Sequence, residues 1–391
     1  MIANVTHLDL NARGSERLAL PTMEALSQLE DVELELSTFQ RPNIIELQSA
    51  FGQSSVSVIK KARTMRILNS FDELSDKKEY DLNINTRGDL LPFYQANFSK
   101  SNSITYCHFP AAKYLIDTQD AEYIKLMNRL ASKKSTSRAS TERLLQSADI
   151  AYVSMMNNST ILTNSQYSSK AISKTFNLRS VVLSPPVDVD TFRKEVLTPS
   201  LPEERNNQVL VISRFNPSKK IENAIRLAKL LKQNGIGKRM KIVGSLSPDR
   251  LDYYSSLLTM VRDYKLTDYV KFQVNVTFQE LMTNMRESKV YLHPLPGEPF
   301  GISTVEAMSS GLIPVVPEIG GHTEFVPLKY QFGTFGQAVK AVSAAFNAPY
   351  EESVLISDSV QLFSIKNYTQ RFKQIVNELI PYCQACPNII L

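Results

Sequence analysis

The chain of 391 residues contains only three cysteines, Cys107, Cys383 and Cys386, too few for a disulfide framework and consistent with a reducing compartment. No run of about 18 apolar residues occurs, so the sequence predicts no membrane-spanning helix. Residues 1–8 lack a basic region followed by a long apolar one, so we expect no signal peptide. Together these absences favour a protein that works in the cytoplasm.

Two phosphate- and metal-binding motifs are also missing. No Gly-x-Gly-x-x-Gly follows the first predicted strand, which argues against a nicotinamide dinucleotide site. No Asp-x-Asp motif ends a predicted strand in the second half, so we expect neither a divalent metal nor another cofactor. Cys383-Gln-Ala-Cys386 has the spacing of a metal or redox pair, but it lacks a second ligand pair and a thioredoxin-like context.

The bulk composition is that of a globular protein with more than one domain. Hydrophobic residues make up 43% of the chain and charged residues 21%, with a net charge of +5. A length of 391 residues exceeds what one ordinary core organises, so we expect two domains.

Short apolar runs alternate with stretches of helical periodicity along the chain. Strands are expected at 3–9, 32–39, 82–85, 104–108, 150–153, 160–164 and 181–183, and then at 209–213, 240–243, 270–273, 290–293 and 313–316. Because helical stretches separate most of them, the sequence predicts parallel α/β sheets. Residues 197–204 are polar and contain proline, as a linker would. Residues 365–382 predict a final amphipathic helix.

The most informative stretch is 294–311, which follows the predicted strand at 290–293. Pro294, Pro296 and Pro299 exclude regular structure. Helical spacing begins at about Ile302, and Gly311 is placed to end the helix because glycine adopts the left-handed conformation cheaply. A strand, a tight loop and a helix leave free N–H groups at the helix start, where an anion binds readily.

Two carboxylates flank this predicted anion site. Glu298 precedes the helix start, and Glu306 lies about one turn inside the helix. Each carboxylate can accept hydrogen bonds from hydroxyl groups, one on either side of a bound phosphate. A nucleotide sugar has this layout, with a sugar, a diphosphate and a ribose in sequence.

Glu298-x7-Glu306, with Phe300-Gly301 inside it and Gly320-Gly321 after it, resembles the signature of retaining glycosyltransferases of family 4. The resemblance implies that Glu298 and the amides of Phe300 and Gly301 hold the donor sugar. It also implies that the helix start, at Ile302, Ser303 and Thr304, faces the diphosphate. The second glutamate, Glu306, would then bind the ribose.

The resemblance spans essentially the whole chain and implies the α/β GT-B fold, two Rossmann-like domains facing across a cleft. We expect an acceptor-side domain at 1–196, a nucleotide-sugar domain at 197–364, and a helix at 365–391 that crosses back to the first domain. Val181–Asp188, with Pro185-Pro186, resembles the segment that closes the first domain in this family.

Further site residues follow from the same resemblance. Arg214 and Lys219 match the family's pair of cations that neutralises the departing diphosphate, with Lys220 as the alternative if the register is shifted by one. His108, in Tyr106-Cys-His-Phe-Pro, matches a histidine beside the reacting sugar. Gly14 remains available to bring backbone near a phosphate, although Arg13 replaces the glycine usual before it.

The sequence therefore predicts a metal-independent, retaining hexosyltransferase with a nucleotide sugar as donor. Mannose from GDP-mannose is the first expectation, and the acceptor would be a glycan or a lipid-linked glycan. A transferase using UDP-glucose or UDP-N-acetylglucosamine and a catalytically silent GT-B binding or scaffold protein are the alternatives. No partner nucleic acid is expected.

Two basic segments suggest where such an enzyme works. Six cations lie between Lys125 and Arg143, namely Lys125, Arg129, Lys133, Lys134, Arg138 and Arg143; a second group is Lys60, Lys61, Arg63 and Arg66. Apolar residues are interleaved with both groups. Such segments suit the surface of an anionic bilayer, which predicts peripheral contact at the inner face of the membrane. Two solvated helix faces are the alternative interpretation.

Overall fold

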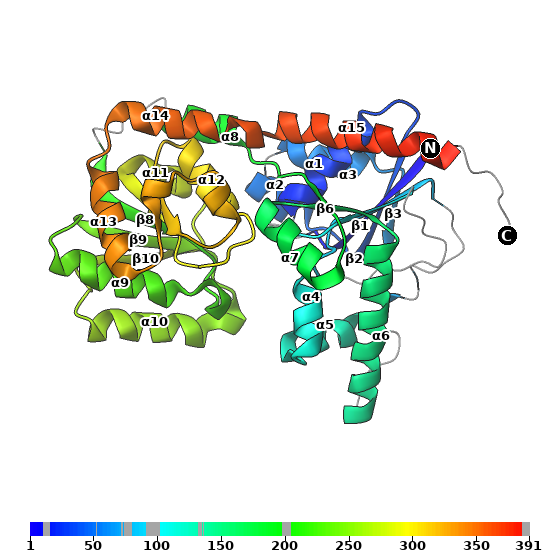
Figure 1. Ribbon diagram of the computed structural model, residues 1–391, viewed down its shortest axis with the longest axis horizontal. Coiled ribbons are helices and arrows are strands. Elements are labelled where there is room, and N and C mark those ends of the chain that lie inside the picture. The colour runs from blue at the N-terminus through cyan, green and yellow to red at the C-terminus, as the bar shows by residue number, and fades with distance from the viewer. Residues whose placement is uncertain are drawn as a thin grey trace. The chain divides into compact units, whose positions relative to one another are not determined.

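The computed structural model describes residues 1–10, 16–51, 53–71, 73, 80–90, 102–131, 135, 137–197 and 205–384. The chain divides into two compact units, coloured by residue number in Figure 1. The first unit comprises residues 1–186 together with the chain from Lys366 onward, and the second comprises residues 187–365.

Within the described ranges, the first unit is built on a parallel sheet in the order β3-β2-β1-β4-β5-β6-β7. The strands are β1 (Ile2–Asp9), β2 (Glu33–Gln40), β3 (Thr64–Ile67), β4 (Leu82–Asn85), β5 (Ser103–Tyr106), β6 (Thr160–Thr163) and β7 (Val181–Val182). The strand order runs outward from β1 in both directions. This doubly wound topology brings the carboxyl ends of β1, β4 and β5 to one edge, where α/β proteins bind ligands.

Helices cover both faces of this first sheet. They are α1 (Glu16–Ser27), α2 (Ile44–Phe51), α3 (Gln53–Lys61), α4 (Ala111–Asp117), α5 (Ala121–Leu130), α6 (Arg138–Asn157), α7 (Gln166–Phe176) and α15 (Ile365–Gln384). One core packs side chains of α1, α3 and α15 against the strands. The other packs α4 to α7. The terminal helix is anchored in the first unit by Tyr368, whose hydroxyl lies 2.7 Å from Thr22 Oγ1.

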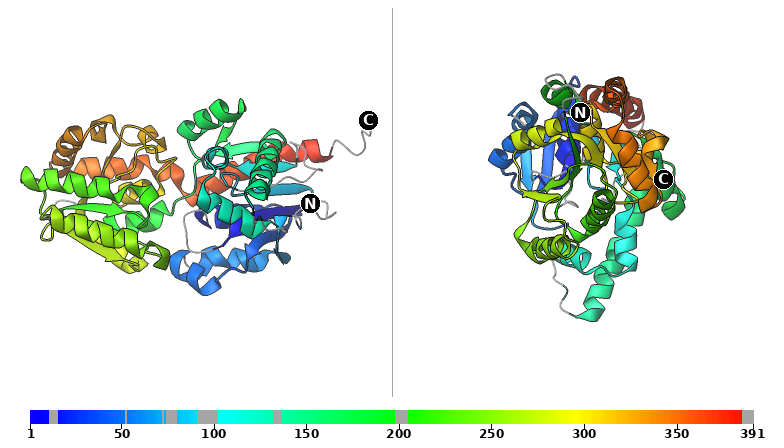
Figure 2. Two further views of the ribbon diagram at one scale, coloured as in Figure 1. Left: turned by 90° about the horizontal axis from the view of Figure 1, so that it is seen from below. Right: turned by 90° about the vertical axis from the view of Figure 1, so that its left-hand side faces the viewer.

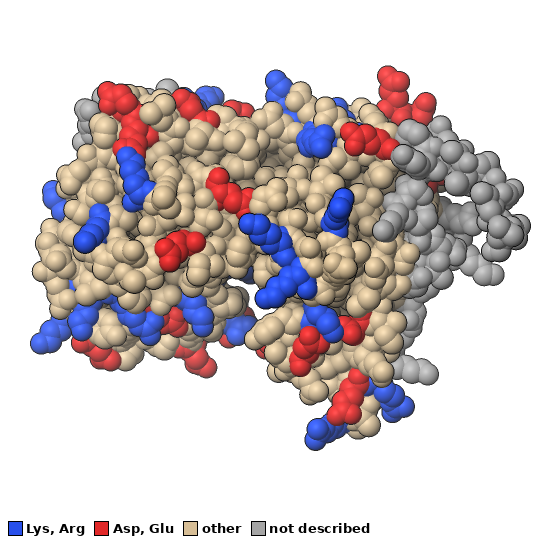
Figure 3. Space-filling model, in the orientation of Figure 1, with Lys and Arg blue, Asp and Glu red and all other residues tan. Residues whose placement is uncertain are grey.

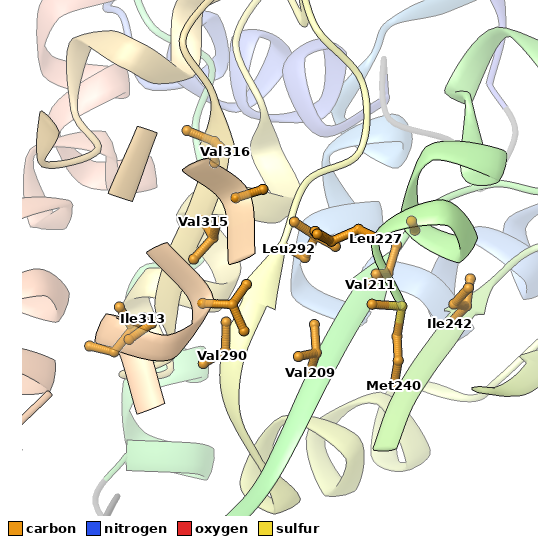
Figure 4. Close-up of a cluster of buried hydrophobic side chains, with 14 of the residues drawn as sticks. Val209, Val211, Leu227, Met240, Ile242, Val290, Leu292, Ile313, Val315 and Val316 are labelled. Carbon is orange, nitrogen blue, oxygen red and sulfur yellow. The ribbon is translucent and has the colours of Figure 1, made fainter. Parts of the chain in front are cut away.

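The second unit repeats the plan with a parallel sheet in the order β10-β9-β8-β11-β12-β13 among its described residues. The strands are β8 (Asn206–Ile212), β9 (Arg239–Gly244), β10 (Val270–Val274), β11 (Ser288–Leu292), β12 (Ile313–Pro317) and β13 (Gln331–Phe332). Valine, leucine, isoleucine and methionine side chains from β8, β9, β11 and β12 form the buried cluster of Figure 4. Such continuous apolar strands are typical of parallel sheets buried on both faces.

The helices of the second unit are α8 (Val189–Phe192), α9 (Ile221–Gln233), α10 (Leu251–Asp263), α11 (Phe278–Glu287), α12 (Ile302–Ser309), α13 (Phe335–Phe346) and α14 (Tyr350–Ser359). Short turns complete it, namely η2 (Arg193–Leu197), η4 (Pro217–Lys219), η5 (Pro248–Arg250), η6 (Gly321–Glu324), η7 (Leu328–Tyr330) and η8 (Gln361–Phe363). Helices lie on both sides of each sheet when the molecule is viewed from other directions (Figure 2). No helix within the described ranges is long and apolar enough to cross a bilayer.

The predicted parallel α/β architecture is confirmed, and one predicted strand is wrong. Residues 150–153 lie inside α6 rather than in a strand, because Leu145, Ala148, Tyr152 and Met155 continue one buried helical stripe through them. A short apolar run does not by itself distinguish a strand from a helix. Strands β3 (four residues) and β13 (two residues) were not predicted.

The division between the units also differs from the predicted one. Residues 187–197 belong to the second unit, whereas the sequence placed the boundary after residue 196. Phe192 and Val196 are buried with Leu210 and Met285, which are core residues of the second unit. Apolar packing in the folded state therefore places residues 187–197 in the second unit. The boundary between the units thus comes before the polar linker sequence.

Candidate functional site

The loop between β11 and α12 carries the predicted donor-binding residues. Helix α12 begins at Ile302, as predicted, and ends before Gly311, which has a φ of 73°. Its N-cap is Gly301, with a φ of 100° and no side chain to bond the first amides. Thr304 N donates to the Gly301 carbonyl at 3.0 Å. The amides of Ile302 and Ser303 come before any intrahelical acceptor, so these two are available to an anion.

Close backbone packing holds this loop against the segment after β12. Gly321 N donates to the Glu298 carbonyl at 2.8 Å, and Gly297 N donates to the Ile319 carbonyl at 2.7 Å. A Cβ on Gly320, whose φ is 136°, would lie 2.7 Å from the Glu298 carbonyl oxygen. Only glycine fits there, so the Gly320-Gly321 pair fixes the backbone of Glu298.

The carboxylate of Glu298 pairs with Lys219. Lys219 Nζ donates to Glu298 Oε2 at 2.9 Å, and both side chains are largely enclosed. Lys219 ends the short turn η4 after β8, and Glu298 follows β11. These are neighbouring strands at the point where the sheet order reverses, so the two predicted site residues meet at the topological switch point.

Electrostatics keep the Glu298 carboxyl ionised. Burial by itself would raise its pKa, but the neighbouring His293 and Lys219 outweigh burial and hold the pKa far below the usual range. The group therefore presents acceptor oxygens only, which suits it to bind hydroxyl protons.

Three side chains that the sequence analysis did not single out surround this carboxylate. His293, directly after β11, places Nε2 3.5 Å from Glu298 Oε2, and its Nδ1 lies 3.1 Å from the Tyr291 hydroxyl. Tyr291 also bonds Ser303 in the first turn of α12, at 2.8 Å. The ring of His322 lies 5.3 Å from that of His293. A histidine at the carboxyl end of a buried strand is a signal that could have identified His293 in advance.

Glu306 and Phe300 lie deeper in the unit. Glu306 occupies the second turn of α12 and is only 3% exposed. Phe300 packs against Phe325 and Phe363 with ring centroids 5.3 and 5.2 Å away. The Phe300 side chain thus anchors the loop in the core, and its contribution to a donor site is confined to its backbone.

The structure distinguishes the cations that follow β8. Arg214 is exposed just beyond the strand, and Lys219 contacts Glu298. Lys220, the alternative considered from sequence, is exposed and caps α9 in a left-handed conformation with a φ of 51°. Lys219 is therefore the lysine that meets the site in the second unit.

His108 lies in the first unit, just after β5. Its pKa is lowered by burial, with Asp89 opposing that effect, so the imidazole is neutral at pH 7. Asp89, after β4, is held by the Arg87 guanidinium at 3.2 Å. This cluster occupies the ligand-binding edge of the first sheet. The predicted Gly14 lies outside the described residues, as does Cys386, while Cys383 falls in the last turn of α15.

Comparison with known proteins agrees with this geometry. Residues 193–343 match the family model for glycosyl transferases group 1. A GDP-Man:Man(3)GlcNAc(2)-PP-Dol alpha-1,2-mannosyltransferase of Dictyostelium discoideum is 27% identical over 223 residues, which are 53% of this chain and 44% of the relative. The O-antigen chain mannosyltransferase RfbU of Salmonella typhimurium is 30% identical over 159 residues, covering 41% of this chain and 42% of the relative. The chain thus matches less than half the length of these curated relatives.

Solved structures give the fold over nearly the whole chain. Sucrose-phosphate synthase from Thermosynechococcus elongatus superposes with a TM-score of 0.68 at 15% identity, covering 98% of this chain and 100% of that one. Anabaena HepE in complex with UDP gives a TM-score of 0.65 at 16% identity, covering 96% and 99%. The protein therefore has the GT-B fold of two Rossmann-like units, and its second unit carries a glycosyl transferases group 1 domain.

Proposed function

We propose that the protein is a retaining glycosyltransferase that transfers mannose from GDP-mannose to a glycan or lipid-linked glycan acceptor. The observation that carries the proposal is the Lys219–Glu298 pair beside the glycine-capped start of α12. The names of the curated relatives favour GDP-mannose and, for the Dictyostelium protein, a dolichol-linked acceptor. Retention of configuration rests on the family resemblance.

The charges of the second unit suit a diphosphate leaving group. When the bond between the sugar C1 and the diphosphate breaks, negative charge accumulates on the diphosphate. The acceptor oxygen forms the new bond to C1, and its proton passes to an oxygen of the departing diphosphate. The amides at the start of α12, the Lys219 ammonium and the exposed Arg214 guanidinium would stabilise that charge. We propose that these groups serve in place of a divalent metal.

A thermal-shift panel tests the proposed donor. GDP-mannose should raise the unfolding midpoint more than UDP-glucose or UDP-N-acetylglucosamine, because ligand binding to the native state stabilises it. A larger shift with a UDP sugar would assign the other donor class. Donor-induced stabilisation without nucleotide release in the presence of acceptor glycans would instead identify a silent binding protein.

Glu306→Ala should weaken nucleotide binding. If its carboxylate accepts hydrogen bonds from both ribose hydroxyls, the substitution removes about 1.5–3 kcal/mol from the binding free energy, as for hydrogen bonds to a charged group. The loss should appear equally for GDP and GDP-mannose in calorimetric titrations, since both contain the ribose. Unchanged affinity for both ligands would show that Glu306 serves only the packing of α12.

We further propose peripheral contact with the inner, cytoplasmic face of an anionic membrane, through α5 and α6. Lys125 and Arg143 are exposed, and the side chain of Arg138 is 92% exposed. Helix α6 extends beyond the rest of the first unit (Figures 1 and 2). Lys133 and Lys134 lie outside the described residues.

Fewer side chains are available for that membrane contact than the sequence predicted. Met127 and Leu130, expected beside the charges, are buried in the core of the first unit. Lys61 pairs with Glu24 and Arg63 with Glu33, so two of the four cations of the second basic segment are neutralised. On the face drawn in Figure 3, acidic and basic side chains are interspersed where Figure 1 places α5 and α6. Membrane contact would therefore be electrostatic and weak.

Liposome co-sedimentation checks this proposal. The protein should bind anionic but not neutral vesicles, and binding should weaken as salt rises because exposed charges are screened. Changing Lys125, Arg138 and Arg143 together to glutamine should abolish it, at about 1 kcal/mol per basic residue. The matched control changes three exposed lysines of the second unit, Lys265, Lys271 and Lys340, to glutamine. Absence of binding to both vesicle types at low salt would indicate a soluble acceptor.

A further inference from the structure

One nitrogen of His293 is buried beside the donor-site carboxylate without a hydrogen-bond partner. His293 is 4% exposed and follows β11 directly. Among the residues that the structure describes, Nε2 has no hydrogen-bond partner, and it lies 3.5 Å from Glu298 Oε2. A buried polar group without a partner costs free energy, so this position suits a ligand that supplies one.

The other side of the ring fixes its tautomer. The Tyr291 hydroxyl lies 2.8 Å from Ser303 Oγ and 3.1 Å from His293 Nδ1. When Ser303 donates to Tyr291 and Tyr291 donates to Nδ1, Nδ1 is an acceptor, so the ring carries its N–H at Nε2. The ionised carboxylate of Glu298 favours the same tautomer, because it attracts an N–H and repels a lone pair. The N–H of Nε2 therefore faces Glu298.

His322, the remaining neighbour of His293, does not compete for the Nε2–H that faces Glu298. His322 donates from Nε2 to the Pro317 carbonyl at 2.8 Å, with its ring beside that of His293. Burial lowers the pKa of His322 to about 4, so the ring stays neutral near pH 7. The charged groups facing His293 are then Glu298 and, behind it, Lys219.

We propose that His293 and Glu298 together bind one hydroxyl group of the donor hexose. The Nε2–H donates to the hydroxyl oxygen, and the hydroxyl donates its own proton to the carboxylate. An oxygen placed about 2.8 Å from each atom satisfies both bonds across their 3.5 Å separation. Because one group only donates and the other only accepts, the pair selects a hydroxyl over a hydrogen or a methoxy group at that sugar position.

This inference rests on the proposed function, since it names a contact to the donor sugar. A purely structural role of His293 would affect binding of the sugar nucleotide and of the free nucleotide alike. The proposed contact instead predicts that only the binding of the sugar depends on His293. Affinity for GDP-mannose should depend on His293, while affinity for free GDP should not. The same contrast applies to UDP-glucose and UDP if the donor is a UDP sugar.

Two substitutions distinguish the roles of the two ring nitrogens of His293. His293→Asn keeps a carbonyl oxygen near the Tyr291 hydroxyl but removes the donor facing Glu298. His293→Gln places an amide N–H close to the position of Nε2. We expect His293→Asn to weaken GDP-mannose binding about 10–100-fold and His293→Gln to stay within about threefold of the parent, with GDP affinity unchanged in both.

Calorimetric titration of the full chain and its variants with GDP-mannose, GDP, UDP-glucose and UDP measures these affinities. Unfolding midpoints measured alongside show whether each variant is folded. Equal affinity of parent and His293→Asn for the nucleotide sugar that the parent binds would overturn the inference and leave the proposed function standing. Equal losses for the sugar nucleotide and the free nucleotide would also overturn it. A parent chain that binds none of the four ligands would sink the inference and the proposed function together.

Discussion

Lys219→Ala is expected to lower kcat by roughly 10²–10³, the range for losing one preorganised charge stabiliser. Lys219 Nζ lies 2.9 Å from Glu298, in the part of the second unit where the departing diphosphate would gather charge. The substitution removes the cation and also leaves the Glu298 carboxylate without its closest counter-charge. Initial rates of nucleotide release at saturating donor and acceptor measure the effect.

The neighbouring lysine provides a matched control. Lys220→Ala removes the same charge one residue later, from an exposed side chain at the N-cap position of α9 that makes no capping hydrogen bond. Its kcat should stay within about threefold of the parent, because Lys219 and not Lys220 contacts Glu298. Arg214→Ala should resemble Lys219→Ala, without loss of stability, since Arg214 is exposed. Full activity of both Lys219→Ala and Arg214→Ala would show that other groups hold the diphosphate.

Gly244→Ala is expected to destabilise the second unit by about 3 kcal/mol, through overpacking of backbone against side chain. A Cβ built on Gly244, the last residue of β9, would lie 1.8 Å from the Ser213 carbonyl oxygen. The N–H of Ser213 donates to the Val243 carbonyl at 2.9 Å. Ser213 therefore cannot move away from the new Cβ without breaking this hydrogen bond at the sheet edge. Calorimetry should show a midpoint lower by about 6–12 °C, given the size of the unit.

Gly235→Ala provides a comparison in which the backbone is strained but the added Cβ makes no clash. Gly235 has a φ of 65°, and its Cβ would meet nothing within 4 Å. The expected loss is therefore only the left-handed penalty of about 1–2 kcal/mol. Because Ser213 precedes Arg214, Gly244→Ala should also reduce activity in the fraction that stays folded. A midpoint no lower than that of Gly235→Ala would contradict the packing argument.

The sequence identified the features that depend on residues close together along the chain. The helix that starts near Ile302 and stops at Gly311 follows from proline exclusion, apolar spacing and one glycine, all within about 20 residues. The parallel sheets follow from alternation of apolar runs and helical stretches. Such patterns report the geometry of one element, and the chain keeps that geometry when it folds.

Tertiary structure decided the features that depend on residues far apart. Lys61 and Arg63 have no acidic neighbours in sequence, yet they pair with Glu24 on α1 and Glu33 on β2. Residues 150–153 have the composition of a strand, but the continuous buried stripe of α6 includes them in a helix. Local propensity is a small free energy, and packing overrides it where the two disagree.

The candidate site combines both kinds of information. The sequence alone determined that Glu298 precedes a helix start and that two lysines follow β8, because strand, loop and helix are local patterns. Only the folded chain decided that Lys219 rather than Lys220 meets Glu298, and that His293 turns a nitrogen toward the same carboxylate. The physical reason is that Lys219 and Glu298 are 79 residues apart, and the pairing of β8 with β11 brings them together. His293 and Glu298 are close in sequence, but long-range backbone bonds of Gly297 and Gly321 hold the loop that orients them.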